Sequence, residues 1–271
     1  MLLSFAVGTL LQSGSLLASL DSHRNVPFSL SGGHFIVVRG AVGSHPLHFV
    51  IDTGASHSVI DTTAAADIGL TPLTESVTVH AFGRTVQAGR VIVSGLSLGP
   101  ARTSLACLVV DLPWSGIDGI LGLDFLRRRS LTIDFENKSI SFGRELELES
   151  RVSFVPDSPL VLVAVQLKGQ DVLLSVDTGS PEISLFEDSR FRGGRRMTSL
   201  RRQVHRDLAG EAPVRHVQLP TVQMGDGRWL GLRGTLRSRR SGGRDGVLGV
   251  ASLNLKRIHF EFEHGVLSWD R

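Results

Sequence analysis

Residues 49–55 read FVIDTGA, and residues 174–180 read LSVDTGS. In each copy a short apolar run passes through Asp-Thr into glycine, which is typical of a buried strand that ends in a tight turn. A single turn of this kind is ordinary, because Asp and Gly are common turn residues. The second copy makes coincidence a poor explanation, because Asp52 and Asp177 hold the same place in both.

Three further blocks repeat in the same order as this pair. Residues 91–99 match 217–225, residues 118–122 match 245–249, and residues 133–142 match 260–269. The shift between the copies drifts only from 125 to 127 residues. The simplest account is two copies of one unit of about 125 residues, packed as a pseudo-two-fold pair.

Short runs rich in β-branched residues, bounded by Gly, Pro or Ser, predict strands in both copies. They lie at residues 35–39, 47–51, 91–93, 105–110, 131–135, 160–167, 172–176, 214–222 and 258–262. Helical patterns are brief and lie at residues 62–68 and 123–128. The sequence therefore predicts an all-β protein of two small β-barrel-like lobes with short helices. We place the first lobe at residues 21–150 and the second at residues 151–271.

The composition is that of a globular protein. Of the 271 residues, 41% are hydrophobic and 20% are charged, which is ample material for a core. The net charge is +3, and arginines gather at residues 190–206 and 233–244. Solvated loops explain these arginines best, because no aromatic platform or recognition-helix pattern accompanies them. No nucleic-acid partner is expected, while steering of acidic substrates stays open.

Residues 2–20 are mostly apolar and small. Gly8 and Gln12 interrupt this run, so a stable membrane span is not expected. The run also lacks the basic start that is typical of export signals. We interpret residues 1–20 as a signal segment, with an N-terminal strand or a membrane anchor as alternatives. A secreted or periplasmic location follows from that interpretation.

Cysteine and histidine offer no other site. Cys107 is the only cysteine, which excludes an intrachain disulfide. No Cys/His cluster has the spacing of a zinc site, so the sequence predicts neither a metal nor a cofactor. His57 lies close to the first Asp-Thr-Gly motif without a ligand partner near it in sequence, and we interpret it as a surface or edge histidine.

Two-fold packing of the copies would bring Asp52 and Asp177 face to face near the axis. Two carboxylates about 3 Å apart cannot both ionise readily, so they hold one proton between them. The ionised carboxylate can take a proton from a water that attacks a carbonyl, while the protonated one hydrogen-bonds that carbonyl. Such a pair can therefore carry both halves of an amide hydrolysis without a nucleophilic side chain or a metal.

Each Asp-Thr-Gly motif is followed by an apolar-apolar-Gly element, Ile120-Leu121-Gly122 in the first copy and Val247-Leu248-Gly249 in the second. The linked motifs resemble those of aspartic peptidases of the retropepsin-like and pepsin-like type, in the single-chain form found in bacteria. The resemblance covers residues 35–269. It implies a bilobal, pseudo-two-fold acid-protease fold. It also implies an aspartic endopeptidase that cuts peptide or protein substrates in a cleft between the lobes.

The resemblance assigns a catalytic pair, Asp52 and Asp177. It also assigns supporting residues, which are Thr53, Gly54, Thr178, Gly179 and Ser180. Each threonine would bond to the backbone of the opposite lobe, and each glycine would let a backbone N–H reach a carboxylate. The serine could hydrogen-bond the outer oxygen of Asp177, which Ala55 cannot do for Asp52.

The chain has no tyrosine, so the tyrosine of a pepsin-like flap is absent. Retropepsin-like lobes instead supply one glycine-bearing hairpin each, for which residues 79–91 and 204–217 are the candidates. Phe82 in the first of these either faces substrate or packs inward. Because two lobes are fused in one chain, the resemblance implies a monomer with pseudo-dimeric lobes.

Three interpretations of function stay open from the sequence. An active endopeptidase is favoured because both aspartates are present. A catalytically silent peptide-binding module on the same fold would be favoured by loss of one aspartate. A basic β protein that binds nucleic acid or an anionic surface draws only on the arginine-rich second half.

Overall fold

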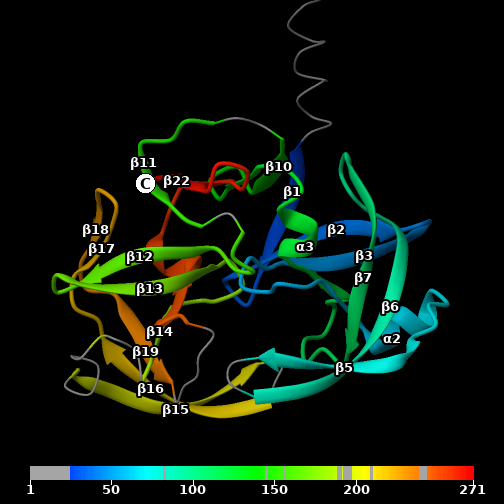
Figure 1. Ribbon diagram of the computed structural model, residues 1–271, viewed down its shortest axis with the longest axis horizontal. Coiled ribbons are helices and arrows are strands. Elements are labelled where there is room, and N and C mark those ends of the chain that lie inside the picture. The colour runs from blue at the N-terminus through cyan, green and yellow to red at the C-terminus, as the bar shows by residue number, and fades with distance from the viewer. Residues whose placement is uncertain are drawn as a thin grey trace, which may run out of the picture.

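The computed structural model describes residues 25–81, 84–143, 146–155, 157–187, 191, 197–207, 210–237 and 243–271. Within these residues the protein is built almost entirely of β-strands (Figure 1). The helices described are α2 (Thr62–Asp67), α3 (Leu123–Leu126) and the 3-10 helix Val250–Leu253. The expected all-β fold with short helices is confirmed. The predicted signal segment at residues 1–20 and the candidate flap residue Phe82 lie outside the described residues.

A thirteen-stranded sheet contains the strands of the first half and three strands from later in the chain. Its strands are β1 (Asn25–Ser31), β2 (Phe35–Val42), β3 (His45–Ile51), β4 (Val59–Asp61), β5 (Leu73–Ala81), β6 (Arg84–Leu98), β7 (Ala101–Val110), β8 (Gly119–Leu121), β9 (Leu131–Asp134), β10 (Ser139–Phe142), β11 (Ser150–Ser153), β21 (Arg257–Glu261) and β22 (Val266–Asp270). Their order is β11-β22-β21-β9-β10-β1-β2-β3-β8-β4-β7-β6-β5.

A nine-stranded sheet forms most of the second half. Its strands are β12 (Leu162–Leu167), β13 (Gln170–Asp177), β14 (Ile183–Phe186), β15 (Ser199–Asp207), β16 (Gly210–Gln218), β17 (Val222–Met224), β18 (Gly227–Trp229), β19 (Arg233–Arg237) and β20 (Gly246–Gly249). The order is β15-β16-β19-β14-β20-β13-β12-β17-β18. The predicted strand at residues 214–222 proves to be two, β16 and β17, with Pro220 between them. Proline has no N–H for a sheet ladder.

The duplication read from the sequence is visible in the strand registers. In the first half β3 and β8 are parallel, and Val50 lies beside Ile120. In the second half β13 and β20 are parallel, and Ser175 lies beside Val247. These partners are related by the shifts of 125 and 127 residues seen in the sequence. The same sequence unit has therefore adopted the same local fold twice.

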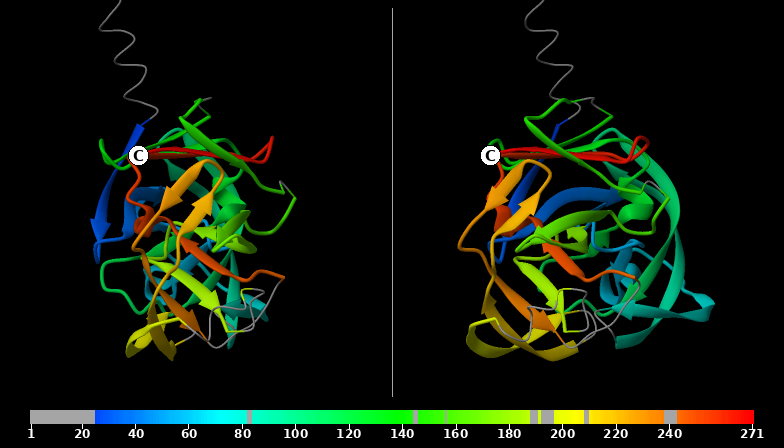
Figure 2. Two further views of the ribbon diagram at one scale, coloured as in Figure 1. Left: turned by 90° about the vertical axis from the view of Figure 1, so that its left-hand side faces the viewer. Right: turned by 60° about the vertical axis from the view of Figure 1, so that its left-hand side comes forward.

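The two halves are joined by direct strand pairing. Strand β9 of the first half lies antiparallel to β21 of the second, with Ile133 opposite Ile258, and both side chains are fully buried. Strand β11, which begins at the predicted lobe boundary, pairs with β22. Figures 1 and 2 show this joining region at one end of the molecule. Hydrophobic residues of both halves form one continuous core cluster, so the two Asp-Thr-Gly turns sit on a shared scaffold.

The two candidate flaps are hairpins. Strands β5 and β6 pair as far as Ala81 and Arg84, and β15 and β16 pair as far as Asp207 and Gly210. Both hairpins lie at the end of the molecule away from the joining region (Figure 1). Their tips, residues 82–83 and 208–209, lie outside the described residues.

Candidate active site

Each candidate aspartate stands at the end of a buried strand. Asp52 directly follows β3, and Asp177 is the last residue of β13. The apolar-apolar-Gly strand beside each turn supports it, because the Asp52 N–H donates to the Leu121 carbonyl at 3.0 Å. A Cβ on Gly122 would lie 2.7 Å from the His57 backbone, so this crossing requires glycine.

Four hydrogen bonds between the threonines and the opposite backbone lock the two turns together. The Thr53 N–H donates to Thr178 Oγ1, and the Thr178 N–H donates to Thr53 Oγ1, both at 3.1 Å. The Thr53 hydroxyl donates to the Val176 carbonyl at 2.9 Å, and the Thr178 hydroxyl donates to the Ile51 carbonyl at 2.8 Å. Both threonines are buried, at 0% and 1% exposure. The relative position of the two aspartates is therefore fixed by a reciprocal network, as the resemblance implied.

Replacing Thr53 with Val should lower the free energy of unfolding by about 2–5 kcal/mol. The change keeps the side-chain shape but leaves the buried Thr178 N–H and Val176 carbonyl without their partner, and each such group costs about 1–3 kcal/mol. Thr63→Val on exposed helix α2 is the matched control. Urea unfolding of both variants measures the difference. Equal stability of the two variants would show that the cross-bonds do not stabilise the fold.

The two carboxyl groups meet across this lock. Gly54 N–H donates to Asp52 Oδ1 and Gly179 N–H donates to Asp177 Oδ1, each at 2.8 Å. The carboxyl groups also hydrogen-bond each other. Burial raises the pKa of both, and the charge of Asp52 raises the pKa of Asp177 further. Two carboxyl groups in contact with raised pKa values hold a proton between them and titrate as a unit.

The surroundings of the two carboxyl groups are unequal. Backbone N–H groups of Gly54 and Ala55 both lower the pKa of Asp52, whereas Gly179 is the backbone donor that does so for Asp177. The expected bond from Ser180 to Asp177 is wrong, because the Ser180 hydroxyl donates instead to the Glu182 carbonyl at 3.1 Å. That carbonyl lies two residues further along the same turn and is the nearer acceptor. The ionised form is therefore better supported on Asp52 than on Asp177.

The raised pKa of Asp177 makes a prediction about stability. A raised pKa in the folded protein gives stability that is complete below the ordinary value of 3.8 and is lost as pH rises through the folded-state pKa. Asp177→Asn cannot ionise and escapes that loss. Its Tm should therefore rise relative to wild type between about pH 4 and pH 8. Asp171→Asn, on the exposed face of β13, should show no such trend. A Tm difference that is constant with pH would contradict this account.

A cavity of about 270 Å³ opens over the two carboxyl groups. Residues of both halves line it, and they are Asp52, Gly54, Ala55, Ser56, His57, Val59, Val79, Leu108, Pro159, Leu160, Ser175, Asp177, Arg244 and Val247. Val79 comes from the first candidate flap, which brings that hairpin to the edge of the cavity. The wall combines apolar side chains with the two carboxyl groups and one arginine.

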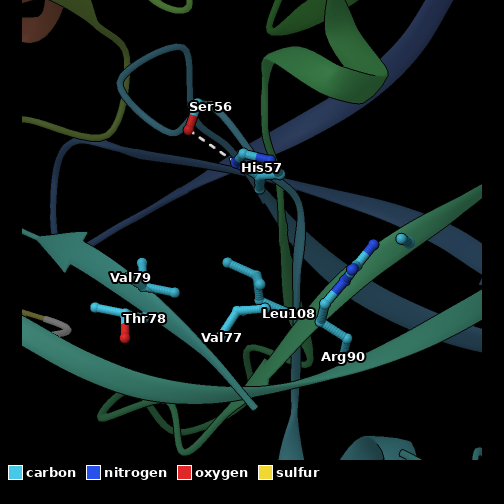
Figure 3. Close-up of a pocket in the computed structure, with 8 residues that line it drawn as sticks. Ser56, His57, Val77, Thr78, Val79, Arg90 and Leu108 are labelled. Atoms are coloured by element: carbon cyan, nitrogen blue, oxygen red, sulfur yellow. Dashed lines mark hydrogen bonds between the residues drawn. The ribbon is translucent and has the colours of Figure 1, made fainter. Parts of the chain in front are cut away.

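A second cavity of about 520 Å³ adjoins the first and shares Ser56, His57, Val79 and Leu108 with it. Figure 3 shows Ser56 and His57 on one side of this space, with Val77 and Val79 of β5 across it. The Ser56 hydroxyl and His57 Nδ1 are hydrogen-bonded at 2.9 Å. His57 is exposed, as expected, and it lines both cavities. The two cavities together form a continuous space beneath the β5–β6 hairpin.

Sequence reasoning missed two features of this site. Arg244 lines the cavity, although the sequence placed it only within an arginine-rich stretch. Its position directly before the repeated Asp-Gly-apolar-Leu-Gly block was the signal that could have singled it out. Asp124 of α3 accepts hydrogen bonds from the Ser58 N–H and hydroxyl, at 2.6–3.0 Å, and so holds the loop that follows Asp52. No local pattern pairs those two residues.

Other reactive groups do not compete with the two aspartates. Burial raises the pKa of the Cys107 thiol to about 12, so the thiolate needed for attack is disfavoured. Within the described ranges, no group of three or more His, Cys, Asp or Glu side chains is placed to hold a metal ion. In the same part of the chain, no helix is both long enough and apolar enough to cross a bilayer.

An all-β fold with two interlocked Asp-Thr-Gly turns is the architecture expected of an aspartic peptidase. Residues 38–125 match the model of the aspartyl protease family. The matched segment holds the first Asp-Thr-Gly motif, the β5–β6 hairpin and Ile120-Leu121-Gly122. The predicted resemblance is thereby confirmed, and an aspartic-protease-like function in general is supported.

One curated relative is Protein DNA-DAMAGE INDUCIBLE 1 of Arabidopsis thaliana, which is 29% identical over 105 residues. The aligned part is 38% of this chain. The chain spans about a quarter of the length of that relative, since the alignment covers 25% of it.

Proposed function

We propose that the protein is an aspartic endopeptidase that hydrolyses peptide bonds with a water activated by Asp52 and Asp177. The observation that carries the proposal is the pair of carboxyl groups in mutual contact, held by the reciprocal bonds of Thr53 and Thr178. The cavity over the pair, lined from both halves of the chain, supports a cleft for an extended peptide. The family match of residues 38–125 supports the same chemistry.

The unequal surroundings of the pair suggest how the proton is used. Asp52, with two backbone donors, serves as the ionised base and takes a proton from the bridging water. Asp177, whose pKa is raised well above its ordinary value, holds the shared proton and donates a hydrogen bond to the scissile carbonyl. The resulting hydroxide adds to the carbonyl carbon. Proton transfer to the amide nitrogen then lets the C–N bond break, leaving a carboxylic acid and an amine.

The test is digestion of a denatured protein mixture across pH, with and without a pepstatin-type inhibitor, with cleavage sites identified by mass spectrometry. We expect cleavage that the inhibitor abolishes. Tight binding of the inhibitor without turnover at any pH would instead favour the alternative, a catalytically silent peptide-binding module on the same fold. Turnover that the inhibitor leaves untouched would contradict the proposed mechanism.

The proposal extends to partners and location. The substrate is a peptide or protein. We propose a monomer, because β9 and β21 join the two halves within one chain and no second copy is needed to assemble the pair. A secreted or periplasmic location is proposed from residues 1–20 alone, and fractionation of cells that express the full chain tests it.

A further inference from the structure

Arg244 lies in the wall of the cavity that holds Asp52 and Asp177. It is the sole arginine or lysine among the described residues that line this cavity. The rest of the wall is apolar or small, apart from the two carboxyl groups and the neighbouring Ser56, His57 and Ser175. A guanidinium is a costly group to bury without a partner. Its presence beside the pair therefore calls for a reason.

The duplication provides a reference for this position. The Asp118 carboxylate accepts from the His48 N–H at 2.7 Å, and the Asp245 carboxylate accepts from the Leu173 N–H at 2.8 Å. These two aspartates therefore do the same work in the two halves. The residue before Asp118 is Ile117, which is 7% exposed and packs in an apolar cluster. Because the fold accepts isoleucine at this place, arginine at position 244 is not a requirement of the fold.

The contacts of Arg244 leave hydrogen-bonding capacity unused. Its guanidinium carbon lies 5.9 Å from the centre of the Phe186 ring, which holds the side chain from one side. Its Nε is buried and has no hydrogen-bond partner within the described part of the chain. Burial lowers the pKa of the guanidinium, and the negative charge of Asp177 opposes that shift. The side chain is thus positioned at the cavity with a donor that awaits an acceptor.

The acceptor that suits a guanidinium best is a carboxylate, because its two oxygens match the planar fork of donors. We propose that Arg244 is a specificity-determining residue that binds a carboxylate of the substrate close to the scissile bond. The carboxylate comes either from an Asp or Glu side chain or from the free C-terminus of a peptide. The inference rests on the proposed function, because it assumes that the cavity receives peptide.

The test uses peptides that are identical except at one position, which carries Glu, Gln or Leu and is moved stepwise along both sides of the cleavage site. Each peptide is made with a free and with an amidated C-terminus. The enzymes are wild type, Arg244→Ile, which copies Ile117 of the first half, and Arg244→Lys. Arg39→Ile removes an exposed guanidinium from β2 and is the matched control. Each variant is assayed at its own optimum pH, because Arg244 also lowers the pKa of Asp177.

At one position wild type should cleave the Glu peptide with a kcat/KM about tenfold or more above the Gln peptide, as expected for a charge-assisted contact. Arg244→Ile should lose that preference, mainly through KM, and still cleave the Leu peptide. Arg244→Lys should keep part of it. Preference for a free over an amidated end would identify the C-terminal carboxylate as the ligand instead. Equal cleavage of acidic, neutral and amidated peptides by wild type would overturn the inference.

Calorimetric binding of hydroxyl-bearing peptide mimics, with Glu or Gln at the same positions and with free or amidated ends, separates this inference from the proposed function. If no peptide is cleaved, the proposed function fails, and the mimics still decide the role of Arg244. Tighter binding of a carboxylate-bearing mimic by wild type, lost in Arg244→Ile, would support a carboxylate site. Equal binding of all mimics would reject it.

Discussion

Replacing Asp52 with Asn should reduce the kcat for peptide cleavage by at least about 100-fold, because general base catalysis by a positioned carboxylate contributes roughly 10²–10⁴ in rate. Asparagine keeps the shape of the side chain and can still accept from the Gly54 N–H, so the turn should remain folded. It cannot take a proton from water. Asp177→Asn should produce a similar loss, because the pair works as a unit.

Asp171→Asn is the matched control for both variants, since it removes an exposed carboxylate from β13, the strand that ends at Asp177. Its kcat should equal that of wild type. Active-site titration with a pepstatin-type inhibitor, together with Tm, separates loss of chemistry from loss of folded protein. Asp52→Asn protein that still cleaves at the wild-type rate would rule out Asp52 as the base.

Gly54→Ala should be nearly as damaging as loss of an aspartate. A Cβ built on Gly54 would lie 2.5 Å from Asp177 Oδ2, and the alanine must therefore push that carboxylate aside. A displacement of about 1 Å at a reacting group can cost on the order of 100-fold in rate. We expect kcat to fall by that factor or more, as measured with the substrate used for the aspartate variants.

Gly179→Ala should be milder, because a Cβ there would lie 3.0 Å from Asp52 Cγ. Gly89 provides the control, since a Cβ there meets nothing closer than 3.6 Å and Gly89→Ala should behave as wild type. The order of damage, Gly54 above Gly179 above Gly89, is the result to check. Equal activity of the Gly54 and Gly89 variants would mean that the two turns lie further apart than described.

The fold could be predicted from the sequence because its evidence is local and repeated. Each Asp-Thr-Gly turn follows an apolar strand, and each is followed at a fixed distance by an apolar-apolar-Gly element. Once the shift of 125–127 residues is seen, the strand partners of one half predict those of the other. The parallel partners Val50 with Ile120 and Ser175 with Val247 follow that rule.

The details that sequence could not predict depend on contacts between distant residues or on a choice between nearby acceptors. The Ser180 hydroxyl could reach either Asp177 or the Glu182 carbonyl, and only the geometry of the turn selects the second. Arg244 reaches the cavity because β20 lies between β13 and β14. Composition alone placed it among solvated arginines, because a charge cluster does not reveal which member points inward.

The central claim is that Asp52 and Asp177 share one proton and act while holding it, and the pH dependence of kcat/KM tests it most directly. The rate should be bell-shaped, falling at low pH where both carboxyl groups are protonated and at high pH where both are ionised. The high-pH limb should lie well above the ordinary carboxyl value of 3.8, because the pKa of Asp177 is raised. A rate that rises with pH to a plateau would contradict the shared-proton pair.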